Sequence, residues 1–228
     1  MRTNNSIRIL QLLETSSYPL GATQLSEKTG IPSATIGRVL ARLEKENKVE
    51  KVGNRGRRLT PSGEHYLHTA TIHNTKMSVA DKLISLMHDN TIERMYEVQL
   101  TRRLLEAHTV ELAARNATPE DVQTLEDILF DYTYEVRHGN PHSETDAQLH
   151  LHIAKMSGNA TIHQILLLLL NTDSRYYGQL SALLQQTTGE RIEQHRNIVD
   201  AIRDRNPERA VLAMTWHLDT ILRKRDAQ

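Results

Sequence analysis

The chain has 228 residues with 28 basic and 28 acidic side chains, so its formal net charge is zero. It contains no cysteine, which excludes disulfides, thiolate metal ligands and thiol catalysis. The opening MRTNNSIRIL lacks the apolar stretch of a secretory signal, and the longest apolar run, Ile165–Leu170, is far shorter than the roughly 20 residues that span a bilayer. These features predict a soluble, cytoplasmic protein with no membrane partner.

Charge is divided unevenly along the chain. Residues 1–76 carry 12 basic and 6 acidic side chains, a net charge of +6, so the remainder carries −6. Such an asymmetry predicts two units, of which the first faces a polyanion. With only one Phe and one Trp, the core must consist of Leu, Ile, Val and Ala, which is typical of a mainly α fold.

Residues 1–75 show the element order of a winged helix-turn-helix. The periodicity of apolar residues and the turn signals predict helices over 6–15, 22–29 and 33–47, and strands over 48–52 and 57–60. Ser33, after the turn Gly30-Ile31-Pro32, is the expected N-cap of the third helix. Gly53-Asn54-Arg55-Gly56 suits a hairpin turn between the strands, and Pro61 is placed to begin the next helix.

The third helix is the expected recognition helix for the major groove of double-stranded DNA. We expect DNA contacts from polar and cationic side chains on this helix and on the hairpin, namely Ser33, Thr35, Arg38, Arg42, Lys45, Arg55, Arg57 and Arg58. A solvated charged surface would have a similar composition. The concentration of these residues on the two elements that face DNA in such a fold favours operator binding.

The rest of the chain has the pattern of an antiparallel helical bundle. A helical linker is expected over 76–90, followed by a bundle domain over 91–228. The predicted bundle helices cover 93–116, 119–138, 143–156, 160–184, 188–205 and 207–225. Short loops with Gly or Pro separate them, as expected for antiparallel neighbours.

Four residues of the bundle form a candidate metal site. Asp146 and His150, spaced i and i+4, share one helix face, while His195 and His217 fall in two later helices. Three imidazoles and one carboxylate suit Zn, Ni, Mn or Fe. The spacing alone is weak evidence, because nine histidines in this part allow many chance combinations, and a buried histidine is more often a hydrogen-bonded core residue.

Three stretches in residues 92–224 resemble the FCD effector-binding domain of the GntR superfamily of bacterial regulators. They are YEVQLTRRLLEAHTVELAARNATPED, DAQLHLHIAKMSGN and EQHRNIVDAIRDRNPERAVLAMTWHL. The resemblance implies that Asp146, His150, His195 and His217 are metal ligands. It also implies that Arg102 faces the effector cavity and can pair with a carboxylate, with Arg103 as the alternative in a register shifted by one. An ion pair within the bundle is the other interpretation of Arg102.

The amino-terminal part departs from the GntR pattern. IPSATIGRVLARLEKEN stands where a GntR reading head carries a Val-Ser-Arg-x-x-Val-Arg motif, and LTPSGEHYL looks closer to MarR-like and other winged-helix heads. The family's operator pattern is therefore not carried over to this chain, whereas the DNA-binding class is.

These observations predict a regulator, not an enzyme, whose operator affinity is controlled by a small carboxylate at the metal site. A homodimer is expected, because two symmetric heads read a two-fold operator. One alternative is a metal-dependent enzyme, a hydrolase or oxygenase, fused to a winged helix. Another is a purely structural metal.

Overall fold

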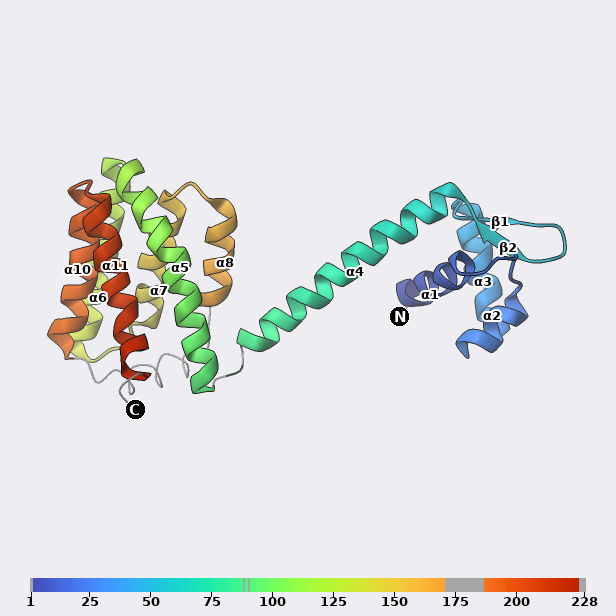
Figure 1. Cartoon of the computed structure of the whole chain (residues 1–228), viewed down its shortest axis with the longest axis horizontal. Helices are drawn as coiled ribbons and strands as arrows, with labels where there is room; N and C mark the ends of the chain where they lie inside the picture. The colour runs from blue at the N-terminus through green and yellow to red at the C-terminus, as the bar shows by residue number, and fades with distance from the viewer. Residues whose placement is uncertain (1, 88, 90, 171–186, 226–228) are drawn as a thin grey trace. The chain divides into compact units, whose positions relative to one another are not determined.

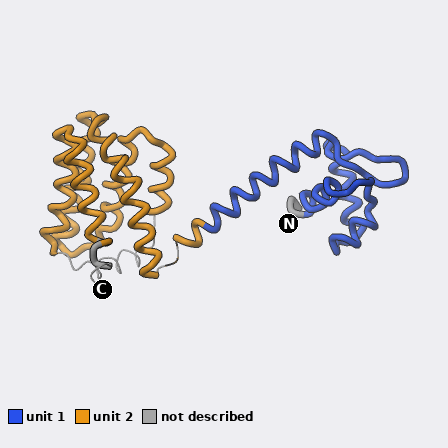
Figure 2. The backbone as a smooth tube through the Cα atoms, in the orientation of Figure 1, with its two compact units in different colours: residues 1–82 blue, residues 83–228 orange. Residues whose placement is uncertain are grey.

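A computed structural model of the chain describes residues 2–87, 89, 91–170 and 187–225. The chain divides into two compact units, residues 1–82 and 83–228 (Figure 2). The domain boundary expected at residue 75 falls inside α4 (Pro61–Met87), one continuous helix that covers most of the predicted linker. Within the described residues, no helix is long and apolar enough to cross a membrane.

The first unit is a three-helix cluster with a small antiparallel hairpin (Figure 1). Its elements before α4 are α1 (Arg2–Glu14), α2 (Ala22–Thr29), α3 (Ser33–Lys45), β1 (Val49–Lys51) and β2 (Arg57–Leu59). Val49 is paired with Leu59 across the hairpin. The apolar faces of the helices form one core, which includes Ile9, Leu10, Leu25, Ile36, Leu40, Leu43 and Leu67. The mainly α fold with an amino-terminal winged helix-turn-helix is confirmed.

The start of α3 differs from the prediction by one residue. Ser33 is not the N-cap but the first residue of the helix, and Pro32 occupies the cap position without a side-chain cap bond. The carbonyl of Pro32 accepts from the backbone N–H groups of Thr35 and Ile36 at 2.9 and 3.1 Å. The backbone of Pro32, with φ −53° and ψ 135°, leads the chain directly into the helix, so no side-chain cap is used.

The hairpin is packed closely against the rest of the first unit. The backbone of Arg57 exchanges two hydrogen bonds with that of Leu20, at 2.9 and 3.0 Å. At Gly63, in the first turn of α4, an added methyl group would collide with the carbonyl oxygen of Lys48. Glycine is therefore required at Gly63 by the close approach of the chain that leads into β1.

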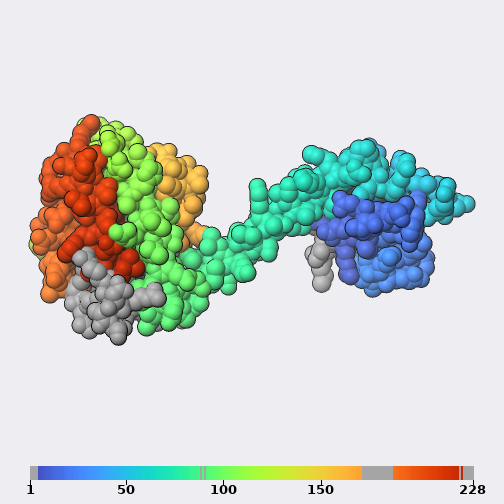
Figure 3. Space-filling view, in the orientation of Figure 1, coloured from blue at the N-terminus to red at the C-terminus, as the bar shows by residue number. Residues whose placement is uncertain are grey.

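The second unit is a bundle of helices around one main apolar core (Figure 1). Its helices are α5 (Ile92–Asn116), α6 (Pro119–His138), α7 (Ser143–Met156), α8 (Ala160–Leu170), α10 (Thr188–Arg203) and α11 (Pro207–Arg225). Of the helix predicted over 160–184, the structure describes α8, and the remainder lies outside the described residues. Figure 3 shows α5 and α11 side by side on one face of this unit.

Local signals define the ends of several bundle helices. α6 begins with a capping box in which Thr118 and Asp121 satisfy each other's backbone N–H groups. It ends at Gly139, which has the left-handed φ of 71° that glycine adopts readily. α10 begins with a second capping box between Thr187 and Glu190. α7 packs against both α5 and α6, which carries its histidine-bearing face into the interior.

Candidate metal centre

The four predicted ligands come together inside the bundle. Asp146 and His150 come from α7, His195 from α10 and His217 from α11, and one ligand atom of each lies within 4.8 Å of the others. His150 and His195 are each only 1% exposed. Two ligands of one ion, each about 2.1 Å from it, can be at most about 4.2 Å apart. The side chains therefore need only a small adjustment to bind a single ion.

All three histidines are oriented by an acceptor on Nδ1. The acceptors are the Glu106 carboxylate for His150, the Arg191 carbonyl at 3.0 Å for His195, and Oε1 of Gln194 at 3.0 Å for His217. An Nδ1–H that donates to such an acceptor leaves Nε2 as the lone-pair atom of the ring. Metal-binding histidines are held in this way by their outer contacts, so the ring orientations fit a metal.

The Nε2 atoms provide the test of whether an ion fits. Nε2 of His150 is buried and has no hydrogen-bond partner among the described residues, which is costly for a polar atom in an interior. Nε2 of His195 lies 3.0 Å from Oδ1 of Asp146. The two ligand atoms therefore already lie close to one point, where a cation bound by both would take the place of any proton between them. Both observations fit a divalent ion at this point.

A buried ion pair supports the site from α5. Nε of Arg102 donates to Oε1 of Glu106 at 2.7 Å, and the other oxygen of Glu106 accepts from His150. Burial would raise the pKa of Glu106, but the charges and hydrogen bonds of Arg102 and His150 outweigh burial and lower the pKa to about 2. Glu106 is therefore ionised, and its charge favours the Nδ1–H tautomer of His150.

The protonation states of two ligands also suit a cation. Burial would raise the pKa of Asp146, but the hydrogen bond from His195 and the neighbouring positive charges hold it below its ordinary range. Burial, together with His195 and His150, holds the pKa of His217 well below 6.5. The site thus presents an ionised carboxylate and a neutral imidazole near pH 7.

The sequence reasoning missed the residues that orient the ligands. Glu106, Gln194 and Tyr132 were not singled out, although the Tyr132 ring lies 4.4 Å from that of His195 between ring centres. Only Glu106 had a usable signal, because Arg102 and Glu106 are spaced i and i+4 and so lie on one face of one helix. Nothing local marks Gln194 or Tyr132.

The two arginines considered for the effector occupy different places. Arg102 is 3% exposed and holds Glu106, so the interpretation as an ion pair within the bundle describes the contact that the structure shows. Arg103, the alternative, pairs instead with Asp219 across the α5–α11 contact. The positive charge of Arg102 still acts on Asp146 and on His217, which places Arg102 near the candidate metal centre.

On α3 the predicted DNA-contacting residues lie at the surface of the first unit. Arg38 is exposed and hydrogen-bonds within its own helix, to Oγ1 of Thr35 at 3.3 Å. Nη2 of Arg42 donates to Oγ of Ser6 in α1 at 2.6 Å, which holds its side chain against the first helix. Ser33 and Lys45 are exposed.

The three hairpin arginines are not equivalent. Arg55 lies in the turn and is exposed. Arg57 lies in β2, where its guanidinium contacts Oε2 of Glu44 in α3 at 2.8 and 3.0 Å and so fastens the hairpin to that helix. Arg58 pairs with Glu50 on the neighbouring strand at 2.6 Å. Arg55 is thus the hairpin arginine without an ion pair among the described residues.

Each of the two units matches a known protein family. Residues 94–220 match the FCD domain, and residues 4–53 match the IclR helix-turn-helix domain. The Uxu operon regulator of Haemophilus influenzae is 26% identical over 204 residues, which cover 87% of this chain and 70% of that protein. A solved GntR structure from Streptococcus agalactiae, also 26% identical, covers 98% of this chain and 100% of its own, with a TM-score of 0.51.

The fold is also shared with a more distant protein. The Escherichia coli McbR/YncC structure is 14% identical and covers 99% of this chain and 97% of its own, with a TM-score of 0.51. The IclR match agrees with the departure from the GntR reading head. It ends at residue 53 and so does not reach LTPSGEHYL, on which the likeness to MarR-like and other winged-helix heads rests. The FCD match spans more than half of the chain, and the chain belongs to the GntR family of transcriptional regulators with an FCD domain.

Proposed function

We propose that this regulator controls its affinity for a DNA operator through a small carboxylate that binds at a divalent transition metal. The metal ligands are Asp146, His150, His195 and His217. The observation that carries the proposal is the convergence of these four side chains, with an Nδ1 acceptor behind every imidazole. A relative that regulates an operon supports the DNA-binding role.

The ligand set supports a metal that still has room for an effector. Three imidazoles and one carboxylate suit Zn, Ni, Mn or Fe. A bound ion supplies a positive centre, and four protein ligands leave positions for a chelating acid when five or six ligands are bound. Arg102 adds a buried positive charge nearby. A carboxylate is therefore the class of ligand that meets complementary charge here.

The positions of the ligands support a link between effector binding and the packing of the bundle helices. Helix α7 carries Asp146 and His150, α10 carries His195, and α11 carries His217. An ion bound by all four therefore links three helices. An effector that changes how these helices pack alters DNA affinity only by the difference in its affinity for the two states.

The first unit is proposed to read double-stranded DNA through α3 and the hairpin. The contacting residues are Ser33, Thr35, Arg38, Arg42, Lys45, Arg55, Arg57 and Arg58. Two copies in a homodimer would present two such heads to a two-fold operator. Arg55 and Lys45 are exposed, which supports phosphate contacts from both elements.

The test is elemental analysis of the purified protein together with mass spectrometry of any small acid that co-purifies. The His195→Ala/His217→Ala double variant should lose the metal. The matched control is His152→Ala on α7, whose imidazole faces Asp121 at 3.8 Å, and this control should keep its metal. Stoichiometric metal in the double variant would overturn the ligand assignment.

The same material tests the effector. Addition of the co-purifying acid to the metal-loaded protein should shift its operator affinity, measured by fluorescence anisotropy, and the acid should be recovered unchanged. Accumulation of a product would favour the enzyme. Unfolding on chelation, with no response of DNA binding to any acid, would favour a structural metal.

A further inference from the structure

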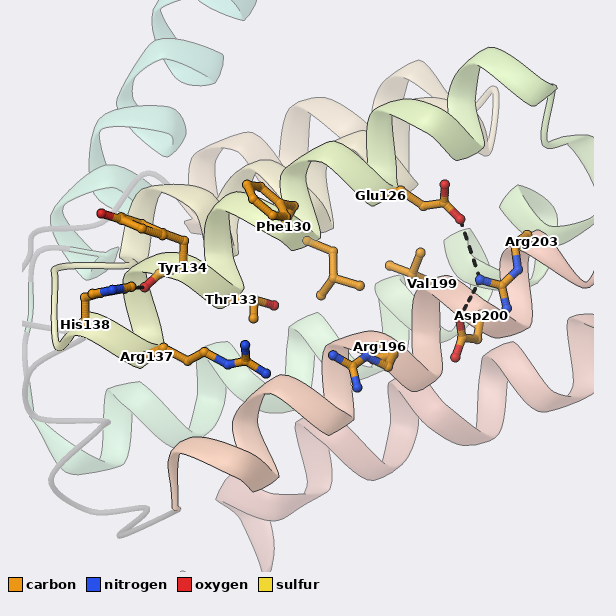
Figure 4. A pocket seen from close by; sticks show the side chains of 11 residues that line it. Glu126, Phe130, Thr133, Tyr134, Arg137, His138, Arg196, Val199, Asp200 and Arg203 are labelled. Carbon is orange, nitrogen blue, oxygen red and sulfur yellow. Dashed lines mark hydrogen bonds and ion pairs between the residues drawn. The ribbon is translucent and has the colours of Figure 1, made fainter.

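A groove of about 530 Å³ lies between α6 and α10, on the outside of the bundle (Figure 4). Leu129 and Val199 lie along it, and Phe130 and Tyr134 stand on α6 beside it. The metal ligands are not among its lining residues. The groove is therefore a separate surface feature of the second unit.

Two arginines face each other across this groove, and no residue in the described part of the chain supplies either with a counter-ion. Arg137 from α6 and Arg196 from α10 point toward one another in Figure 4. Both are exposed, and neither forms an ion pair with any residue that the structure describes. Their neighbour Arg203, by contrast, contacts Asp200 at 2.8 Å and Glu126 at 3.5 Å. One end of the groove thus carries uncompensated positive charge.

The outer face of α6 carries the complementary charge on the same helix. Asp127, Phe130, Asp131, Tyr134 and Arg137 follow one another at helical spacing and are all exposed. Phe130 is 72% and Tyr134 is 54% exposed, so two aromatic rings one helical turn apart lie on the surface of the bundle. The stripe therefore runs from acidic Asp127 to basic Arg137, with Asp131 between the two aromatic residues, and Asp131 has no ion pair among the described residues.

This order is self-complementary for an antiparallel helix pair. If a two-fold axis passes at the level of residue 132, Asp127 and Arg137 lie equally far from it, about 7.5 Å along the helix. Asp127 then faces the partner's Arg137, and Phe130 faces the partner's Tyr134. Each contact occurs twice, as an isologous interface requires. Asp131, one residue from the axis, then faces the partner's Thr133, while the Asp127–Arg137 pairs lie at the edge, where charges are typical of interfaces.

We infer that the outer face of α6, with the groove beside it, is where a second copy of this chain docks in the antiparallel orientation. The partner's Asp127 and Asp131 supply the counter-charge for Arg137 and Arg196. The inference deepens the homodimer of the proposed function and rests on it in that respect. It assigns a face that neither the metal site nor the DNA-binding residues require.

Two alternatives fit these observations less well: a small anion as the occupant of the groove, and a dimer interface on α5 and α11. A small anion would satisfy Arg137 and Arg196 but would leave Phe130, Tyr134 and the acidic half of the stripe without a partner. A second apolar surface lies on α5 and α11, where Leu100, Leu104, Leu212 and Trp216 are 51, 65, 71 and 59% exposed. The arginines of those helices whose side chains the structure describes all form ion pairs within the chain, including Arg103 with Asp219, so the described part of that surface lacks the unpaired arginines of the groove.

A charge exchange in the full-length, metal-loaded protein tests the proposal by sedimentation velocity across a concentration series. Arg137→Asp and Asp127→Arg, each alone, should raise the dimer dissociation constant at least tenfold, because like charges then face each other. The double variant Arg137→Asp/Asp127→Arg should return the constant to within about threefold of wild type. Leu104→Asp serves as the matched control on the other face and should leave it unchanged.

Each contrary outcome has a distinct meaning. Unchanged association in both single variants, or a double variant no better than either single one, overturns the α6 interface. Dimer loss in Leu104→Asp alone assigns the interface to α5 and α11. Loss of a bound anion from Arg137→Asp with an intact dimer assigns the groove to a small ligand. Metal content and operator binding, measured on the same variants, test the proposed function separately.

Discussion

The arginines proposed to contact DNA lie at the surface of the first unit, whereas the charged residues of the metal centre lie in the interior of the second. Arg38 and Arg55 are exposed side chains of a head that faces solvent. Arg102, in the bundle, is 3% exposed and bonded to Glu106, which is 1% exposed. A buried charge must have its partner inside the same fold. An exposed charge is solvated by water, so its partner can be a group of another molecule, such as a DNA phosphate.

This difference determines what each unit needs in order to bind its partner, a metal in the second unit and DNA in the first. The geometry of the metal centre depends on helix packing and on outer contacts, since every imidazole is held through Nδ1. The surface of the head depends on its small core and on the close fit of the hairpin, and less on any single arginine. Substitutions in the second unit should therefore act through the geometry of the metal centre, and those in the first unit through the packing that supports its surface.

The largest expected effect concerns the fit of the hairpin in the head. Gly63→Ala should lower the free energy of unfolding of the first unit by about 3 kcal/mol, because a methyl group would collide with the Lys48 carbonyl. Urea unfolding monitored by circular dichroism measures it. Gly37→Ala, where a methyl group meets no atom within 4 Å, should instead be neutral or stabilising by up to about 1 kcal/mol. Equal losses in the two variants would contradict the packing argument.

The next effect concerns the buried ion pair. Glu106→Gln should weaken metal binding about 10- to 100-fold, because His150 loses a charged acceptor and Arg102 loses its counter-ion. Competitive titration with a chromophoric chelator gives the affinity. Glu111→Gln, on the same helix with an exposed Arg115 partner, should leave the affinity unchanged. A similar loss in both variants would mean that the effect is a general one of α5 and not of the site.

A third test concerns the surface charges of the head. Arg38→Ala should weaken operator binding about tenfold and reduce the slope of log K against log salt by about one, if Arg38 contacts a phosphate. Metal content should not change. Lys28→Ala, an exposed cation on α2 outside the predicted surface, is the control. An unaltered salt slope in Arg38→Ala would remove Arg38 from the DNA interface.

The smallest effect concerns a helix cap of the bundle. Thr118→Ala should cost about 1 kcal/mol of stability, because Thr118 caps α6 and hydrogen-bonds to Asp121. Those hydrogen bonds lower the pKa of Asp121. Its stabilisation is therefore present above the unfolded pKa and is lost as pH falls through the folded one. Unfolding at pH 7 and pH 3 should show a smaller acid sensitivity in the variant than in wild type, with Thr124→Ala as the control.

Much of the architecture could be predicted because it depends on local signals. Thr118-Pro119 and Gly139 mark the two ends of α6, and the predicted range agrees with the observed helix. Ser33 shows the limit of such signals, since the conformation of Pro32 displaced the cap by one position. The element order of the head and the mainly α class of the bundle follow from periodicities that the chain carries in itself.

The candidate metal centre was only partly accessible from sequence. The spacing of Asp146 and His150 places both on one face of a helix, whatever surrounds it. Which of the other histidines join them depends on how α10 and α11 pack, and spacing says nothing about this. The resemblance to the FCD family supplied His195 and His217, and the structure then brought all four within 4.8 Å.

By itself the sequence determined the helices, the winged hairpin and the division of charge between two units, because each depends on residues near one another in the chain. Only the tertiary structure decided that Glu106 orients His150 from α5 and that Gln194 orients His217. It also showed that Arg57 fastens the hairpin to α3 and that Arg137 and Arg196 face each other across a groove with no ion pair to any described residue. The physical reason is that hydrogen bonds and ion pairs act over a few ångströms in space, and only packing brings distant residues that close.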